Sequence, residues 1–529
     1  MRQPETQSPR PSPAAAKAVL KDDDKIERSL RPIKKQDFKY EQARHLLWRA
    51  GFGGNEAQIR YLADLGPEKS VDLVVNYKSA DAPWPKEETF DNDIMRPPTS
   101  DEREMYRRAQ RAQDEETLAK VRLERQRREQ QDRQQIAEVQ KWWLKRMIET
   151  PNPLEEKMTL FWHGLLATNY RTIENSYHMF LQNQLFRKHA TGSYADLMYA
   201  LIRDPAMIAY LDNNDSRKNH PNENLAREIM ELFSLGIGNY TEKDIKEGAR
   251  ALTGYTFEDD QFTFQRNNHD NGQKVILGQA GSFDGDGFVR IILAQPACSR
   301  YIARRLYHFL VADVPTDERG GDKDMPPAQR AVLRQMASML ASGNYELKPV
   351  LRKLLLSEHF YEPQFMNDQI KSPVQLVVGA CRSLNTPVRD LTILNDALDL
   401  MGQRILFPPS VKGWEGGRAW INTSTFYVRQ NILAYLIAAR RPQGYASGDD
   451  SQKFDAMALL EPYGPESAVG KGEPQAVVEA LLRVALGWSP SQGVETLRTY
   501  LAARNNEVTN DSVSGMLLLI TAMPEYQLC

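Results

Sequence analysis

Four polar residues at helical spacing are the first candidates for chemistry in this 529-residue chain. In PNENLAREIMELFSLG, residues 221–236, Asn224, Arg227, Glu228 and Glu231 fill one arc of a predicted helix, and apolar residues fill the other. Glu228 and Glu231 lie three positions apart, which brings their Cβ atoms to roughly 5–6 Å. Adjacent carboxylates repel each other unless a proton or a cation lies between them. The pair is therefore a candidate for acid/base chemistry or for metal binding.

Two chemical roles and one structural role fit these residues. A divalent metal ion accepts carboxylates at positions i and i+3 of a helix, but a helical metal site also recruits His or Asp from other helices. A glycosidase needs carboxyl groups on opposite sides of the bond, roughly 5–10 Å apart, so a second acid would have to come from elsewhere. The structural alternative is an ordinary solvated helix face, on which Arg227 supplies the cation between the carboxylates.

Two histidines are candidates for completing such a site. His163, in FWHGLL, lies off the apolar stripe of its predicted helix, so we do not expect an ordinary core histidine. Its alternative role is helix packing or a surface hydrogen bond. His269, in NNHDNG, lies in a predicted loop beside Asp270, which could orient the ring or itself accept a proton; a plain turn is the alternative. The chain contains neither HExxH nor a closely spaced Cys/His motif. The candidate metal ligands are therefore Glu228, Glu231 and His163, and the ion would be a divalent metal of unknown identity.

Aromatic residues and an acidic loop give further candidates. Trp414 and Trp420 stand in PPSVKGWEGGRAWINTSTF, where flat rings suit either stacking on sugars or hydrophobic packing, and packing is favoured. FDGDG, residues 283–287, lacks the Glu that a calcium loop requires at its twelfth position. We therefore expect Asp286 to cap a helix that begins near Gly287.

The composition limits the classes of function. A formal net charge of −2 argues against the concentrated basic surface that nucleic-acid binding requires. No apolar run approaches the ~20 residues needed to span a bilayer, and the N-terminus lacks the apolar region of a secretory signal. Three widely spaced cysteines indicate neither a disulfide framework nor a zinc knuckle. We therefore expect a cytoplasmic protein without a transmembrane segment.

The elements that must position these residues are mainly helical. Helix signals follow one another from KYEQARHLLWRAGFGG to the end of the chain. The strong helix formers and mixed charges of residues 101–149 predict one long solvated helix, and residues 101–141 of it form a charged arm. Residues 255–280 alternate aromatic and polar side chains, which predicts at most a short β hairpin. The predicted fold is a large, mainly α body divided into a disordered segment (1–36), a helical core (37–440) and a C-terminal helical extension (441–529).

Six motifs that occur in one order connect the chain with a known family. They are HLLWRAGFGG, LFWHGLLATN, NENLAREIMELFSLGIGNYTEKDIKEGARALTGYTF, HDNGQKVILG, QPACSRYIARRLYHFLV and LFPPSVKGWEGGRAWIN. Together they resemble the bacterial domain-of-unknown-function family 1800, from about residue 39 to about residue 438. The site candidates that the resemblance implies are His163, Asn222, Glu223, Asn224, Arg227, Glu228, Glu231, His269 and Asp270.

The resemblance also implies a companion protein. Members of this family are often encoded beside proteins of domain-of-unknown-function family 1501, which resemble the alkaline phosphatase and sulfatase superfamily. This neighbourhood implies a paired role in processing or exporting surface glycans. Those companions are often exported, so co-export with a partner is compatible with the resemblance although this sequence shows no signal.

Two hypotheses of function follow. The first is a helical hydrolase acting on glycans, in which Glu228 and Glu231 are acid/base or metal-binding groups and Arg227 holds an anionic or hydroxyl-rich substrate. His163, His269 and Asp270 would complete the catalytic group. The remaining substrate-binding candidates are Asn222, Glu223, Asn224, Trp414 and Trp420. The second hypothesis is a non-catalytic partner protein, in which the same polar residues form a buried network against another helix.

Overall fold

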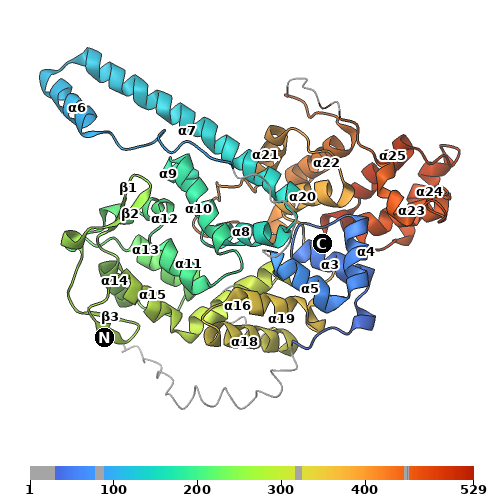
Figure 1. The fold of residues 1–529 in the computed structure, drawn as a ribbon, viewed down its shortest axis with the longest axis horizontal. Coiled ribbons are helices and arrows are strands. Elements are labelled where there is room, and N and C mark those ends of the chain that lie inside the picture. Colours follow the sequence, from blue (N-terminus) through green and yellow to red (C-terminus); the bar gives the residue numbers. More distant parts are fainter. Residues whose placement is uncertain (1–29, 78–87, 316–324, 446–449, 451) are drawn as a thin grey trace, which may run out of the picture.

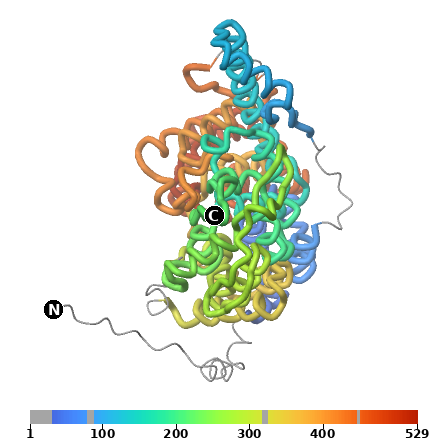
Figure 2. Tube along the Cα trace, turned by 90° about the vertical axis from the view of Figure 1, so that its left-hand side faces the viewer, coloured from blue at the N-terminus to red at the C-terminus, as the bar shows by residue number. Residues whose placement is uncertain are grey.

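The structure, a computed structural model, describes residues 30–77, 88–315, 325–445, 450 and 452–529. Within these ranges it is built from helices and two small antiparallel hairpins, so the predicted mainly α fold is confirmed. Figure 1 shows a broad helical body from which a two-helix arm projects, and Figure 2 shows the arm at the top of the body after a quarter turn. In the described part of the chain, no helix combines the length and apolar character that crossing a membrane requires.

The helices follow one another with short connections (Figure 1). The first group is α3 (Tyr40–Arg49), α4 (Glu56–Leu65), α5 (Pro67–Val75), α6 (Ser100–Ala112), α7 (Glu115–Glu149), α8 (Pro153–Leu165), α9 (Tyr170–Ile173), α10 (Ser176–Lys188), α11 (Tyr194–Leu201) and α12 (Pro205–Tyr210). The second group is α13 (Asn224–Glu228), the π-helix η5 (Ile229–Ser234), α14 (Glu242–Ala251), α15 (Gly285–Leu293), α16 (Pro296–Leu310), α18 (Pro327–Ser342) and α19 (Leu347–Leu355). The third group is α20 (Pro373–Leu384), α21 (Leu391–Leu400), α22 (Thr423–Ala438), α23 (Pro474–Leu486), α24 (Ser491–Ala502) and α25 (Asn510–Thr521).

Short 3₁₀-helices and strands complete the fold. The 3₁₀-helices are η2 (Lys35–Asp37), η4 (Asn213–Asp215), η6 (Arg266–Asn268), η7 (Glu358–Tyr361), η8 (Gly417–Trp420), η9 (Met457–Leu459), η10 (Glu461–Tyr463) and η11 (Pro524–Gln527). The strands are β1 (Tyr255–Glu258), β2 (Gln261–Phe264), β3 (Lys274–Ile276) and β4 (Gln279–Gly281). β1 pairs with β2, and β3 pairs with β4, so the segment in which one hairpin was expected contains two.

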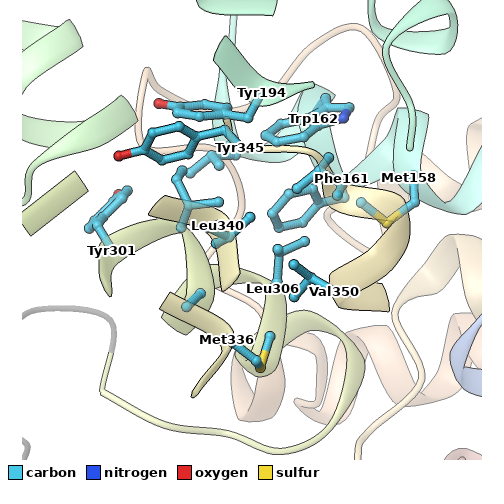
Figure 3. Packing of buried hydrophobic residues seen from close by; sticks show 14 of the residues in the cluster. Met158, Phe161, Trp162, Tyr194, Tyr301, Leu306, Met336, Leu340, Tyr345 and Val350 are labelled. Atoms are coloured by element: carbon cyan, nitrogen blue, oxygen red, sulfur yellow. The ribbon is translucent and has the colours of Figure 1, made fainter. Parts of the chain in front are cut away.

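Two hydrophobic cores hold the helices together. The first gathers side chains of α3–α5, α8 and the helices from α11 to α19. Figure 3 shows part of it, in which the rings of Trp162 and Tyr194 stack with centroids 5.7 Å apart. The second core joins the inner end of α7 with α20–α25. Residues of the C-terminal extension therefore share a core with helices of the preceding segment.

The arm is a helical hairpin, and the prediction of a single helix over residues 101–149 is wrong. The chain reverses at Gln113, which has a left-handed φ of 50°, and Asp114 accepts a hydrogen bond from Thr117 N to begin α7. Neither residue is Gly or Pro, so composition alone does not reveal this break. α7 runs from the tip of the arm into the second core, where Trp143 and Met147 are buried.

The N-terminal boundary differs from the expected one. Most of the segment predicted to be disordered, residues 1–29, lies outside the described residues. Leu30 and Ile33, by contrast, are buried, and Ile33 N donates a hydrogen bond of 2.9 Å to Leu356 O. Arg31 also pairs with Glu358. Two apolar side chains and these contacts are enough to fix residues 30–36 against the end of α19.

Local capping signals define the helices near the candidate site. Thr241 and Asp244, three positions apart in the sequence, form a capping box at the start of α14. The cap of α15, however, is Asp284, whose side chain accepts a hydrogen bond from Gly287 N, so the prediction of Asp286 as the cap is wrong. The helix begins two residues earlier than expected, and this leaves Asp286 free to pair with Arg203 at 2.7 Å.

Candidate functional site

The helix that carries the candidate carboxylates changes its winding in the middle. α13 ends at Glu228, and η5 continues as a π-helix in which Leu235 N donates to Met230 O at 3.0 Å. The predicted helix therefore exists, but its second half does not keep the 100° spacing on which the prediction rested. Single π-helical turns are rare and occur frequently at functional sites.

Side chains from the core satisfy carbonyl groups of this π-helix. Tyr194 Oη donates a hydrogen bond of 2.7 Å to Phe233 O, and the hydroxyl group of Tyr301 donates to Leu232 O. Figure 3 shows both tyrosines within the first core, on the same side of the labelled group as Tyr345. Because these buried contacts compensate for the altered backbone pattern, they fix the direction in which η5 presents its polar side chains.

Glu228 and Glu231 are half-buried neighbours with different surroundings. Glu231 accepts a hydrogen bond of 2.6 Å from Tyr240 Oη. Glu228 forms no hydrogen bond or ion pair with any residue in the described ranges. Burial and then the charge of Glu231 raise the pKa of Glu228, and the opposing effects of Arg227 and Lys412 are smaller. The arrangement therefore combines a Glu228 carboxyl group of raised pKa with a Glu231 carboxyl group that Tyr240 holds by a hydrogen bond.

Arg227 binds two other carboxylates. Its guanidinium group donates two hydrogen bonds of 2.9 Å to Glu242 and one of 3.0 Å to Glu223. These contacts tie α13 to the first turn of α14, and they raise the pKa of Arg227 above its usual range. The guanidinium group thus holds two helices together instead of lying between Glu228 and Glu231.

Asn224, from the predicted helix face, begins α13, and Asn222, a candidate that the resemblance implies, precedes it. Asn222 Oδ1 accepts a hydrogen bond of 2.9 Å from Asn224 N, and its amide group donates to Asp212 O at 3.1 Å. Asn222 therefore closes the turn that begins the helix. The side chain of Asn224 is exposed on the first turn.

His163 is a core residue, contrary to the expectation that it lies off the buried face. It is 1% exposed, and Leu406 N donates a hydrogen bond of 3.0 Å to its Nε2 atom. Burial lowers the pKa of His163 to about 3, so the ring is neutral. The physical reason is that α8 is buried around nearly its whole circumference, which makes a single apolar stripe a poor guide.

The two tryptophans pack within the protein. Trp414 lies against His163 with ring centroids 5.4 Å apart, and Trp420 is 7% exposed. Gly413 makes this packing possible, because its φ is 75° and its Cβ position lies only 2.0 Å from Gly164 O. The favoured interpretation of hydrophobic packing agrees with this geometry.

His269 and Asp270 hold the segment after β2 against α14. His269 is buried, and its Nδ1 atom lies 2.9 Å from Thr253 O. Asp270 pairs with Arg250 at 2.7 Å and accepts a hydrogen bond of 2.8 Å from Gly272 N. The Arg250 guanidinium group lowers the pKa of Asp270, so this carboxyl group is ionised.

The structure does not join these histidines to the carboxylate pair. Across the described residues, no hydrogen bond, ion pair or ring contact links His163 or His269 to Glu228 or Glu231. The same part of the chain contains no group of three or more His, Cys, Asp or Glu side chains placed to hold a metal ion. The predicted ligand set of Glu228, Glu231 and His163 is therefore not assembled in the described part of the chain.

Three residues that sequence reasoning missed surround the carboxylates instead. Tyr240 binds Glu231, burial and the charge of Glu228 raise the pKa of Tyr210, and Lys412 acts electrostatically on Glu228. The ammonium group of Lys412 is exposed and forms no ion pair with a described residue. Tyr240 and Lys412 stand in two of the resemblance motifs, whereas Tyr210 stands in none of them and is distant from both glutamates in the sequence.

The chain belongs to the family described as protein of unknown function, DUF1800, whose model matches residues 45–528. The match includes the C-terminal segment, in which the resemblance was expected to be thin. No curated protein and no solved structure gave a match.

Proposed function

We propose that this protein is a hydrolase whose proton donor is Glu228 and whose substrate is a glycan. The observation that carries the proposal is the half-buried carboxyl group of Glu228, which has a raised pKa and no hydrogen-bond partner among the described residues. A general acid must hold a proton near the working pH and must be free to approach the leaving group. Glu228 combines a raised pKa with a carboxyl group that has no hydrogen-bond partner among the described residues.

Glu231 has a complementary role in this proposal. Tyr240 fixes its carboxylate by a hydrogen bond, and its negative charge helps to keep the proton on Glu228. A fixed negative charge beside the reacting bond also stabilises the positive charge that develops on a sugar ring during glycoside cleavage. Because both carboxyl groups extend from one helix face, they act from the same side of the substrate.

Lys412 and Tyr210 are the substrate-binding candidates. The free ammonium group of Lys412 can hold a hydroxyl or an anionic group, and Tyr210 places a hydroxyl near Glu228. Arg227 is less suited to this role because it is already bound to Glu223 and Glu242. The choice of a glycan as substrate rests on the neighbourhood that the family resemblance implies.

A substrate panel with matched variants tests the proposal. Wild-type protein, Glu228→Gln and Glu258→Gln are compared on glycosides and esters with chromogenic leaving groups. We expect turnover of a glycoside, a loss of about 10²–10⁴-fold in kcat for Glu228→Gln, and wild-type activity for the control at the exposed residue Glu258. Turnover by Glu228→Gln at the wild-type rate, or no hydrolysis by the wild-type protein, would overturn the assignment.

The alternative function is a non-catalytic partner for a companion of domain-of-unknown-function family 1501. The observation that favours it is the arm, on which Met105, Tyr106 and Leu123 expose large apolar side chains; Leu123 is 67% exposed. Co-purification with such a companion, which Leu123→Glu abolishes while Tyr427→Glu does not, would support this alternative. Tyr427 is a suitable control because it is exposed on α22.

A further inference from the structure

Five positively charged side chains are almost completely buried around α3. They are Arg44, Arg49, Lys157, Lys371 and Arg429, each at most 3% exposed, and together they form the cation cluster. None of them forms an ion pair with a carboxylate in the part of the chain that the structure describes. Because burial of an unpaired charge is costly, the cation cluster needs a counter-charge.

The segment 365–371 brings two members of the cluster together. Arg49 Nη2 donates a hydrogen bond of 2.7 Å to Phe365 O, and Arg44 Nη1 donates one of 3.0 Å to Asn367 Oδ1. Both arginines extend from α3, where five residues of helix rise only about 7.5 Å. Their guanidinium groups therefore lie along one short stretch of backbone.

Lys371 and Arg429 lie at the other end of this segment. Lys371 Nζ is 4.1 Å from the centroid of the Trp48 ring, and the guanidinium carbon of Arg44 is 5.7 Å from the same centroid. Arg429 Nη2 donates a hydrogen bond of 2.8 Å to Lys371 O. Two cations thus lie over one ring, and a third binds the backbone of one of them.

Lys157 joins the cluster from α8. Its Nζ atom lies 5.3 Å from the centroid of the Phe52 ring and 5.1 Å from that of Phe309, and it forms no hydrogen bond with a described residue. Burial, and with it the charge of Arg49, lowers the pKa of Lys157 to about 7. The charged form of the amine is therefore destabilised, and a nearby negative charge would stabilise it.

The negative groups near the cluster are too few to balance it. Cys529 is buried beside the segment 365–371, where its backbone N donates a hydrogen bond of 2.9 Å to Gln369 O. Burial lowers the pKa of all five members of the cluster. Cys529 opposes this effect at every member except Arg429, and the exposed Asp368 opposes it at Arg49. Even two full negative charges would not balance three guanidinium groups and two amines, so positive charge remains in excess.

The same place contains buried nitrogen atoms that have no hydrogen-bond partner among the described residues. They are Nε of Arg44, Nε and Nη1 of Arg49, Nε of Arg429 and Nε1 of the neighbouring Trp48. All of these atoms are donors and none can accept. Buried donors without a partner are unfavourable and call for a bound group that supplies acceptors.

We propose that the cation cluster binds a small inorganic anion, of the size of chloride, in the interior of the protein. An anion accepts hydrogen bonds from the unpaired N–H groups and also offsets part of the excess positive charge. A water molecule carries no charge, and it brings two donors of its own that would need acceptors. Because the cluster joins α3, α8, α22 and the segment 365–371, the bound anion stabilises contacts between distant parts of the chain.

Thermal unfolding in defined salts tests the proposal. The protein is exchanged into sodium gluconate, whose bulky anion does not fit among buried side chains, and chloride then replaces gluconate at constant ionic strength. Mass action stabilises a folded protein that binds an ion which the unfolded chain does not bind. We therefore expect the unfolding temperature of the wild-type protein to rise with the logarithm of the chloride concentration. An unfolding temperature that does not rise with chloride would overturn the proposal.

Lys157→Met separates anion binding from general salt effects, which the variant and the wild-type protein share. Methionine fills a similar volume between Phe52 and Phe309 but carries no charge. In gluconate we expect the variant to unfold at a higher temperature than the wild-type protein, because one unpaired buried charge is gone. In chloride its unfolding temperature should rise by less than that of the wild-type protein.

Lys69→Met, at an exposed lysine on α5, is the matched control and should follow the wild-type protein in both salts. A merely structural role of Lys157 would change the stability by the same amount in gluconate and in chloride. Equal chloride responses of Lys157→Met and the wild-type protein would therefore contradict an anion held by the cation cluster.

Discussion

Tyr240 Oη donates a hydrogen bond of 2.6 Å to Glu231, whereas Glu228, three residues earlier, has no such partner among the described residues. This difference separates two carboxyl groups that look equivalent in the sequence. Burial and then the charge of Glu231 raise the pKa of Glu228. Neighbouring carboxyl groups of one helix thus have different surroundings.

Tyr240→Phe removes the hydroxyl group and keeps the ring. We expect kcat to fall about 10- to 100-fold, because a hydrogen bond to a charged group contributes about 1.5–3 kcal/mol and Glu231 is then no longer held in place. Steady-state kinetics measure the effect, with Tyr427→Phe on α22 as the control. An unchanged kcat would show that the hydrogen bond has no role in turnover.

Lys412→Gln removes the cation that lies near Glu228. Its loss should raise KM for the glycoside. The basic limb of the pH profile of kcat/KM should also shift to higher pH, because Lys412 lowers the pKa of Glu228. Lys412→Arg, which keeps the charge, should leave the limb in place. A shift in the opposite direction would contradict the placement of Lys412 beside Glu228.

Arg227→Gln tests whether the guanidinium group binds substrate. We expect kcat and KM to remain unchanged and the protein to lose a little stability, because Arg227 joins α13 to Glu242 at a mostly exposed ion pair. Kinetics and thermal unfolding of the same sample distinguish the two effects. A large rise in KM without a loss of stability would restore the substrate-binding role predicted from the sequence.

His163→Gln tests the neutral, buried histidine. The folded-state pKa of about 3 lies below the unfolded value of 6.5, so the unfolded chain binds the proton first as the pH falls. The stability that His163 contributes is therefore present above pH 6.5 and decreases toward pH 3, by about 2 kcal/mol between pH 7 and pH 5. Urea unfolding at both pH values should show a smaller acid-side loss for His163→Gln. An equal loss in both proteins would mean that the ring is protonated in the folded state.

Local patterns predicted the parts of the fold that depend on neighbours in the sequence. The mainly α fold, the capping box of Thr241 and Asp244, and the helix that carries Glu228 and Glu231 all follow from spacing within a few residues. The break at Gln113 was missed because a left-handed residue other than Gly or Asn leaves little signal in composition.

The rest of the site depends on contacts between distant residues. The π-helix is held by Tyr194 and Tyr301, which lie 39 and 69 residues from the carbonyl groups that they bind. His163 was misplaced because a helix buried on all sides has no single apolar face.

The pH dependence of kcat/KM in wild-type protein and in Glu231→Gln tests the central claim most directly. If Glu228 is the proton donor and the charge of Glu231 keeps its pKa high, Glu231→Gln shifts the basic limb of the profile to lower pH. A basic limb at the same pH in both proteins would show that the titrating acid is a different group.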